Sequence, residues 1–189
     1  MLFRSKKVNN IIIVGAMANN FLSYKGCAIG KSLVEKDTYN IVKKIYLDSI
    51  KFNCELIIPK DCMTSVSFDG IGKSKNIDSI DKDEIILDIG PETIKIIENI
   101  IELSNTILWN GPAGYFENNN FATGTNAIAN KISTNTSTKN LISILGGGDT
   151  ISAINKIDKK LNFTHLSTAG GAFLEYLEGK DLPGLSVLK

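Results

Sequence analysis

Short apolar runs alternate along this chain with longer amphipathic segments, and turns rich in glycine or proline separate them. The runs are apolar on both faces, as in the strands of a parallel sheet that is covered on both sides. The longer segments have near-helical spacing of their apolar residues and predict helices. The expected strands are residues 10–14, 55–58, 85–88, 106–109, 141–145 and 164–167, and the expected helices are residues 15–25, 38–53, 92–104, 124–134, 172–177 and a segment from residue 150 onward.

Strands that alternate with helices throughout predict an α/β fold, a three-layer sandwich with a mostly parallel, Rossmann-like sheet and helices on both faces. The chain has 189 residues and no visible repeat or linker, so we expect residues 1–189 to form a single domain. Residues 64–84 depart from the alternation and predict a loop or an irregular β segment. Glycine turns follow the carboxyl ends of the expected strands, where ligands collect in such folds. We therefore expect one crevice at that edge to gather these turns.

The turn after residues 141–145 is the most specific of them. The glycines Gly146, Gly147 and Gly148 are followed by Asp149 and Thr150, where a helix opens. Free N–H groups at the positive end of a helix bind anions. Because a carboxylate does not ligate a phosphate, Asp149 predicts Mg²⁺ between the two, with Thr150 donating to a phosphate oxygen. The alternative is a tight turn in which Asp149 only caps the helix.

A second glycine-opened helix start lies in residues 167–172, at Gly170 and Gly171. Taken alone, these residues fit an anion site and a packing turn equally well. Two such helix starts on neighbouring strands can bracket a polyphosphate or a phosphoryl group in transit. Phosphoryl transfer depends on positioned donors more than on a protein nucleophile, so the pair of helix starts strengthens the interpretation of each.

The loop from Trp109 to Glu117 follows another expected strand. Gly111 and Pro112 fix the turn, the apolar side chains suit the wall of a purine pocket, and Glu117 suits the hydroxyl groups of a ribose. A buried cluster of Trp109 and Phe116 with a solvated Glu117 explains the same residues without a ligand.

Composition and spacing exclude several classes of function. The 21 Lys and Arg against 20 Asp and Glu give a net charge of +1, so neither nucleic acid nor a membrane surface is expected as a partner. No stretch approaches the roughly 18 apolar residues of a membrane span. Cys27, Cys54 and Cys62 lack CxxC spacing and predict reduced thiols in a cytoplasmic protein. The single histidine, His165, is predicted to be a core residue and not a catalytic base.

A nicotinamide-dependent dehydrogenase is also disfavoured. The first expected strand is not followed by G-x-G-x-x-G with an acidic residue about 20 positions further on, as dinucleotide binding requires. Tight binding of a nicotinamide dinucleotide in a titration would restore that interpretation.

Taken together, these segments resemble the nucleotide-binding C-terminal half of the phosphoglycerate kinase family. The resemblance runs from about Val8 to Gly184. The segments that carry it, in the order and spacing of the family, are Trp109-Asn110-Gly111-Pro112 to Glu117, Gly146 to Thr150, and Ser167 to Ala172 with Leu174 to Lys180. Supporting matches are Gly15 to Ala18, Ile29 to Leu33, Pro59 to Asp61, Leu87 to Pro91 and Leu182 to Gly184.

The resemblance implies a domain that binds ATP or ADP with Mg²⁺, as part of a phosphotransferase with a carboxyl group as acceptor. With a second domain that carries 3-phosphoglycerate, such a domain exchanges a phosphoryl group between ATP and 1,3-bisphosphoglycerate in glycolysis. No covalent protein intermediate is implied. By motif, Gly15, Leu33 and Leu87 line the adenine pocket; Asn110, Pro112, Gly114, Gly147 and Gly148 border the nucleotide; Glu117 holds the ribose, Asp149 the Mg²⁺ and Thr150 a phosphate; and Gly170 and Gly171 cradle the moving phosphoryl group.

Several positions depart from the family pattern. Family members carry a Gly-Gly-Ala-Lys stretch and a second lysine just before the segment that matches Val8, and this sequence has neither these cations nor the acceptor domain. Val14 and Ala16 stand where glycines are usual, Ala169 replaces a common glycine, and Tyr115 replaces a smaller apolar residue. We therefore expect the isolated chain to bind nucleotide but to be inactive or weakly active, with 3-phosphoglycerate a partner only when an N-terminal domain is added. The alternative is a non-catalytic, adenine-nucleotide-binding remnant of a truncated kinase.

Overall fold

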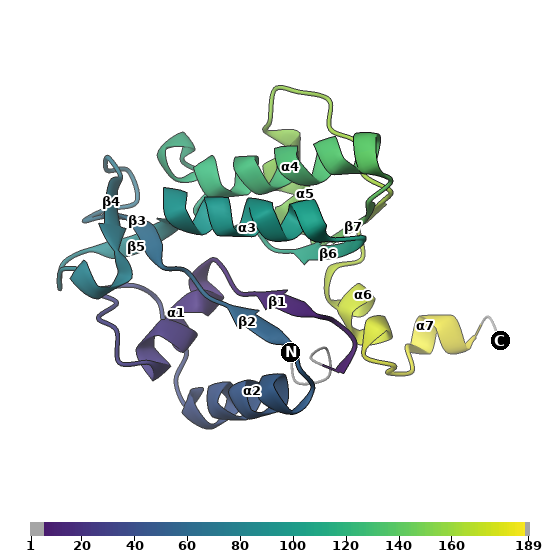
Figure 1. Ribbon diagram of the computed structural model, residues 1–189, viewed down its shortest axis with the longest axis horizontal. Coiled ribbons are helices and arrows are strands. Elements are labelled where there is room, and N and C mark those ends of the chain that lie inside the picture. The colour runs from purple at the N-terminus through teal and green to yellow at the C-terminus, as the bar shows by residue number, and fades with distance from the viewer. Residues whose placement is uncertain (1–5, 188–189) are drawn as a thin grey trace. The chain divides into compact units, whose positions relative to one another are not determined.

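A computed structural model of the protein describes residues 6–187, drawn as a ribbon in Figure 1. These residues fall into two compact units. The first unit comprises residues 6–100 and Pro112–Ile128, and the second comprises Ile101–Gly111 and residues 129–187. The chain thus enters the second unit, returns to the first and enters the second again. Whether residues 1–189 act as a single domain stays a prediction.

The first unit opens with a parallel pair of strands, β1 (Asn10–Ile12) and β2 (Glu55–Ile57). The helices α1 (Ala16–Tyr24) and α2 (Tyr39–Lys51) lie between them in the sequence. Apolar side chains at helical spacing point inward from both helices, so the strand pair and the helices share one core. Its buried members are Ile13, Ala18, Phe21, Val42 and Ile45. The parallel arrangement predicted for these two strands is confirmed.

An antiparallel sheet with the order β4-β3-β5 completes this unit. Its strands are β3 (Asp61–Ser65), β4 (Lys73–Asn76) and β5 (Ile85–Ile89), and the short 3-10 helix η2 (Ile77–Ser79) follows β4. The irregular β segment expected at residues 64–84 is thus confirmed as part of a hairpin. A strand at residues 85–88 is also confirmed, but it pairs antiparallel with β3. These strands follow one another without a crossover helix, which a parallel pairing would require.

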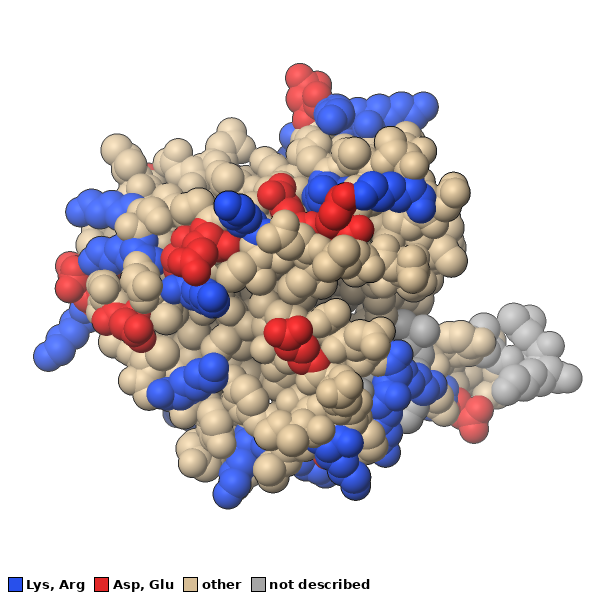
Figure 2. Space-filling model, in the orientation of Figure 1, with Lys and Arg blue, Asp and Glu red and all other residues tan. Residues whose placement is uncertain are grey.

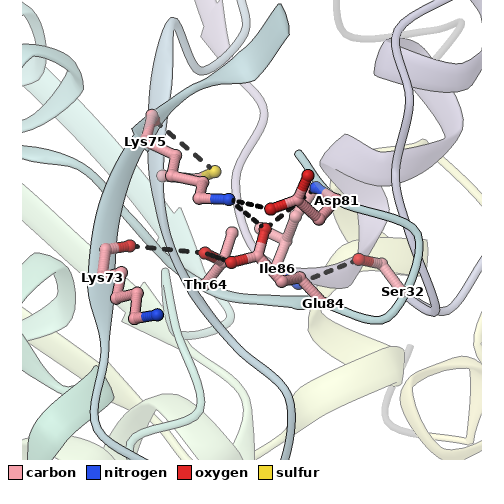
Figure 3. Close-up of polar contacts among 8 residues, drawn as sticks. Ser32, Thr64, Lys73, Lys75, Asp81, Glu84 and Ile86 are labelled. Carbon is pink, nitrogen blue, oxygen red and sulfur yellow. Dashed lines mark hydrogen bonds and ion pairs between the residues drawn. The ribbon is translucent and has the colours of Figure 1, made fainter. Parts of the chain in front are cut away.

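A buried carboxylate ties the antiparallel sheet together (Figure 3). Glu84 is only 5% exposed, and its carboxylate accepts hydrogen bonds from Lys75 Nζ at 2.8 Å, Thr64 Oγ1 at 3.1 Å and the Asp81 N–H at 2.9 Å. Burial by itself raises the pKa of Glu84, but these hydrogen bonds outweigh it and hold the pKa below its usual value. The network therefore joins β3, β4 and the segment that leads into β5.

The second unit contains a parallel sheet with the order β6-β7-β8. The strands are β6 (Thr106–Asn110), β7 (Ile142–Gly146) and β8 (His165–Ser167), close to the predicted ranges. The helices α5 (Gly148–Asn155) and α6 (Gly170–Leu177) follow β7 and β8, and a short α7 (Pro183–Ser186) comes last. The prediction of a core position for His165 is wrong, because its side chain is exposed in β8, the last strand in the order.

Two long helices, α3 (Pro91–Leu103) and α4 (Thr123–Lys139), contribute residues to both units, and a 3-10 turn, η3 (Asn119–Phe121), precedes α4. No helix within residues 6–187 is long and apolar enough to cross a membrane. On the face shown in Figure 2, acidic and basic side chains are interspersed, in keeping with the net charge of +1.

Candidate functional site

The carboxyl ends of β6 and β7 lie side by side in the second unit, because Asn110 pairs with Gly146 in the parallel register. One side chain joins the loops that leave these strands. Thr150 is 0% exposed, and its hydroxyl donates to the Gly146 carbonyl at 2.8 Å and accepts from the Gly111 N–H at 2.7 Å. The tryptophan-bearing loop and the triple-glycine turn therefore meet at one corner of the sheet.

This corner requires glycine at position 147. Gly147 has φ of +96°, and a Cβ there would lie 2.7 Å from Asn110 Oδ1. A Cβ on Gly170 would lie 3.6 Å from the Cα of Gly147, so the start of α6 lies against the start of α5. A Cβ built at Gly148 or Gly171 meets no heavy atom within 4 Å. The second unit thus places two helix N-termini next to each other, with open space beside both and first-turn N–H groups that lack helical partners.

Asp149 lies in the first turn of α5, and its side chain is exposed. Within residues 6–187, no group of three His, Cys, Asp or Glu side chains is placed to hold a metal ion. A metal held entirely by protein side chains is therefore not indicated there. Mg²⁺ commonly uses one or two carboxylates together with the phosphates of its substrate, and an exposed carboxylate beside two helix N-termini fits that mode of binding.

Six other predicted site residues belong to the first unit, and four of them lie close together. Gly15, at the start of α1, has φ of +63°, and a Cβ there would come within 3.0 Å of the Pro112 carbonyl. Leu87 in β5 accepts a hydrogen bond from the Tyr115 N–H at 2.6 Å. Gly114 has no room for a side chain, because a Cβ there would overlap the carboxylate of Asp88. The loop 112–115 is therefore fixed between β5 and the start of α1.

The other two predicted site residues of the first unit, Leu33 and Glu117, are exposed, unlike the tightly packed group just described. The Leu33 side chain is 72% exposed, while its carbonyl accepts a hydrogen bond from Asn19 Nδ2 at 3.0 Å. Glu117 is exposed as well, in the loop that follows Gly114. By contrast, Leu87 is only 5% exposed and packs in the core of the unit.

Sequence reasoning missed a buried acid that organises this loop. Asp88 is 2% exposed and accepts hydrogen bonds from the N–H groups of Gly124 at 2.8 Å and Ile89 at 2.9 Å. Burial raises its pKa to about 7, although these backbone hydrogen bonds act in the opposite direction. The side chain of Thr125, also buried, accepts from the Ala113 N–H at 2.9 Å. The position of Asp88 at the end of the apolar run 85–87 was the only sequence signal of this buried acid. Its hydrogen-bond donor, Gly124, lies 36 positions further along the chain.

Parallel strands that lead into glycine-opened helices place this chain among the α/β proteins whose helix N-termini face the carboxyl edge of a sheet. A family model of phosphoglycerate kinase matches residues 4–180. The chain belongs to the phosphoglycerate kinase family.

Individual relatives agree with this assignment. The chain is 39% identical over 186 residues to a phosphoglycerate kinase of Chelativorans sp. (strain BNC1), and 42% identical over 189 residues to that of Wolbachia pipientis wMel. It spans about half the length of these curated relatives, 47% of each, while 97% and 98% of the chain is matched.

Solved structures give the same result. The phosphoglycerate kinase from Coxiella burnetii matches with a TM-score of 0.91 and 37% identity, over 98% of this chain and 47% of that one. The enzyme from Pyrococcus horikoshii OT3 matches with a TM-score of 0.79 and 26% identity, over 99% and 47%. The predicted α/β fold class is confirmed.

Proposed function

We propose that this chain supplies the Mg-ATP/ADP-binding half of a phosphoglycerate kinase, the glycolytic enzyme that exchanges a phosphoryl group between ATP and 3-phosphoglycerate. The observation that carries the proposal is the corner of the second unit where the starts of α5 and α6 lie against each other, next to Asn110. Two helix N-termini suit the charge of a polyphosphate. Membership of the family supports an adenine nucleotide as its source.

Residues of the second unit take the phosphates and the metal in this proposal. Asn110, Gly147 and Gly148 border the phosphate chain, and Asp149 coordinates Mg²⁺. Thr150, expected from the sequence to donate to a phosphate, is 0% exposed and donates its hydroxyl proton to the Gly146 carbonyl, so it supports this corner from within. Gly170 and Gly171 open α6, whose first turn cradles the phosphoryl group in transit; the Gly170 N–H donates to the Thr168 carbonyl at 3.1 Å before any ligand binds. When bound, Mg²⁺ neutralises part of the phosphate charge.

Residues of the first unit take the adenosine. Gly15, Leu33 and Leu87 line the base, with Pro112 and Gly114 beside them, and Glu117 accepts hydrogen bonds from the ribose. The exposed Leu33 offers apolar surface to a planar base, and the exposed carboxylate of Glu117 is free of hydrogen bonds from any residue between 6 and 187. These two side chains are the ones in this group that a ligand reaches most readily.

The contribution of this chain to catalysis is positional. No side chain needs to form a covalent intermediate, because the two helix N-termini hold the phosphoryl group in line and stabilise its charge. The acceptor, the carboxyl group of 3-phosphoglycerate, requires a second domain, and the relatives are about twice as long as this chain. We expect the isolated chain to bind nucleotide in the cytoplasm and to show little or no turnover.

Titration calorimetry of the chain with ADP, in the presence of Mg²⁺ or of a chelator, tests the binding. Asp149→Ala is expected to weaken the binding of Mg-ADP more than that of metal-free ADP. Asp158→Ala is a matched control, because Asp158 is another exposed acid of the second unit. Equal losses with and without Mg²⁺ would remove the metal role, and a wild-type chain that does not bind Mg-ADP would refute the proposed function.

The alternative is a non-catalytic, adenine-nucleotide-binding remnant of a truncated kinase. A coupled assay of the chain alone, and then mixed with an acceptor domain of a relative, separates the two. Activity only in the mixture supports the kinase half. Nucleotide binding with no activity in either sample supports the remnant.

A further inference from the structure

The loop that carries Glu117 is braced by a hairpin far from it in the sequence. The hairpin loop, residues 66–72, connects β3 to β4, and the Glu117 loop comprises residues 115–121. The rings of Phe68 and Tyr115 pack edge to face with centroids 5.0 Å apart. In addition, Asn118 Nδ2 donates to the Phe68 carbonyl at 2.8 Å. Ring packing and a hydrogen bond thus act at the two positions that flank Phe116 and Glu117.

Further contacts extend the brace along the Glu117 loop. Asn120 Nδ2 donates to the Gly70 carbonyl at 3.2 Å. A Cβ on Gly72 would lie 3.0 Å from the ring of Phe121, which is 0% exposed, so the hairpin backbone packs directly on a buried ring. Both ends of the hairpin loop therefore contact the same short segment.

The hairpin is itself well anchored. β3 and β4 pair in register from Asp61 opposite Asn76 to Thr64 opposite Lys73, and the Glu84 network of Figure 3 ties both strands to the segment before β5. Within the hairpin loop, the Gly70 N–H donates to the Ser67 carbonyl at 3.2 Å. The anchored β3–β4 hairpin can therefore restrict the motion of the Glu117 loop, which packs on it.

The Glu117 loop is also held by hydrogen bonds of its own and by one to β5. Asn118 Oδ1 accepts from the Asn120 N–H at 2.9 Å, and the Tyr115 N–H donates to the Leu87 carbonyl at 2.6 Å. Glu117 is the only acid in the loop. Its carboxylate accepts no hydrogen bond from residues 6–187, although its neighbours are fixed on both sides.

We propose that the hairpin loop is a positioning element, in which Phe68, Tyr115 and Asn118 hold Glu117 in the orientation that accepts the hydroxyl groups of a nucleotide ribose. This inference rests on the proposed nucleotide function and adds a specific device to it. A loop that is already ordered loses less conformational entropy when the ligand binds. If the brace is removed, only a fraction of the molecules has a competent loop, and the apparent affinity falls by that fraction.

Phe68→Ala tests the brace, because Phe68 is half exposed and its loss leaves the buried core intact. We expect Mg-ADP to bind about 3- to 10-fold more weakly by calorimetry, the range set by one aromatic pair and partial loop disorder. Binding of Mg-2′,3′-dideoxy-ADP, which lacks the ribose hydroxyls, should be unchanged. Tyr115→Val removes the same ring contact from the other side and should behave alike, whereas Tyr115→Phe should restore wild-type affinity.

Ile71→Ala is the matched control. Ile71 lies in the same hairpin loop and is 84% exposed, so its truncation should leave the affinities for both nucleotides unchanged. A double mutant gives a second readout: in the Glu117→Gln background, Phe68→Ala should cause no further loss, because both changes act through one carboxylate.

Unchanged Mg-ADP affinity in both Phe68→Ala and Tyr115→Val, with a loss in Glu117→Gln, would overturn the brace and leave the proposed function standing. Equal weakening of ADP and dideoxy-ADP would also overturn it, because the effect would then not pass through the ribose. A wild-type chain without affinity for Mg-ADP would overturn the brace and the proposed function together.

Discussion

Replacement of Thr150 by valine, which keeps the shape of the side chain and removes its hydroxyl, tests the corner between β6 and β7. The hydroxyl makes two short hydrogen bonds, to the Gly146 carbonyl at 2.8 Å and from the Gly111 N–H at 2.7 Å. Thr150 is 0% exposed, so valine at this position leaves the buried Gly146 carbonyl without this hydrogen bond. The N–H of Gly111, which is half-buried, loses its acceptor as well. An unmade buried hydrogen bond costs about 1–3 kcal/mol, and we expect a loss of about 2 kcal/mol in the free energy of unfolding.

Two measurements check this expectation. Denaturant titration gives the loss of stability, and hydrogen exchange at the Gly111 amide reports the hydrogen bond itself. Thr150→Ser is the control: it removes one buried methyl group at a cost of about 1 kcal/mol but keeps the hydroxyl, so Gly111 should stay protected. If Gly111 is as well protected in Thr150→Val as in the wild type, Thr150 does not join the two loops.

Three further predictions follow from residues already described. Glu117→Gln should weaken Mg-ADP binding by about 1 kcal/mol, and an unchanged calorimetric affinity would exclude Glu117 from the site. Gly147→Ala should destabilise the protein by about 2 kcal/mol, because φ of +96° is strained for alanine and the new Cβ would meet Asn110 Oδ1; Gly148→Ala has free space, and an equal loss there would contradict the argument. The hydrogen bonds to the Glu84 carboxylate hold the pKa of Glu84 below 4.5. The ionised Glu84 therefore contributes fully to the stability of the fold above pH 4.5, and this contribution is lost as the pH falls through the lowered pKa. The loss of stability in Glu84→Gln should therefore be larger at pH 6 than at pH 3 in denaturant titrations, and a pH-independent difference would be evidence against the charged network.

The parallel part of the fold was predictable from the sequence because its strands are apolar runs that end in glycine. Residues 106–109 and 141–145 were expected as strands, and the structure has them at Thr106–Asn110 and Ile142–Gly146. The strand β4 was not predictable as such, because Lys73–Asn76 carries no apolar residue and is mostly exposed. Its conformation is set by pairing with β3, which the local pattern does not reveal.

The candidate site was predictable where its residues are neighbours in the sequence. The glycines and the acidic residue between Gly146 and Thr150 predict the start of a helix. The partners that fix these residues lie far away: Thr150 bonds to Gly111, 39 positions earlier, and Asp88 bonds to Gly124, 36 positions later. Such contacts depend on how strands are ordered in space, and only the structure supplies that order.

The path of the chain through its two units constrains how the protein forms during synthesis. Residues 112–128 complete the first unit, because Gly124 satisfies the buried Asp88 and the loop at Gly114 closes over it. A growing polypeptide that has reached residue 100 therefore has an incomplete first unit, in which Asp88 still lacks the Gly124 N–H whose hydrogen bond it accepts in the folded protein. Segments usually fold as they emerge, N-terminal first, but here maturation of the earlier unit must wait until part of the later one has left the ribosome.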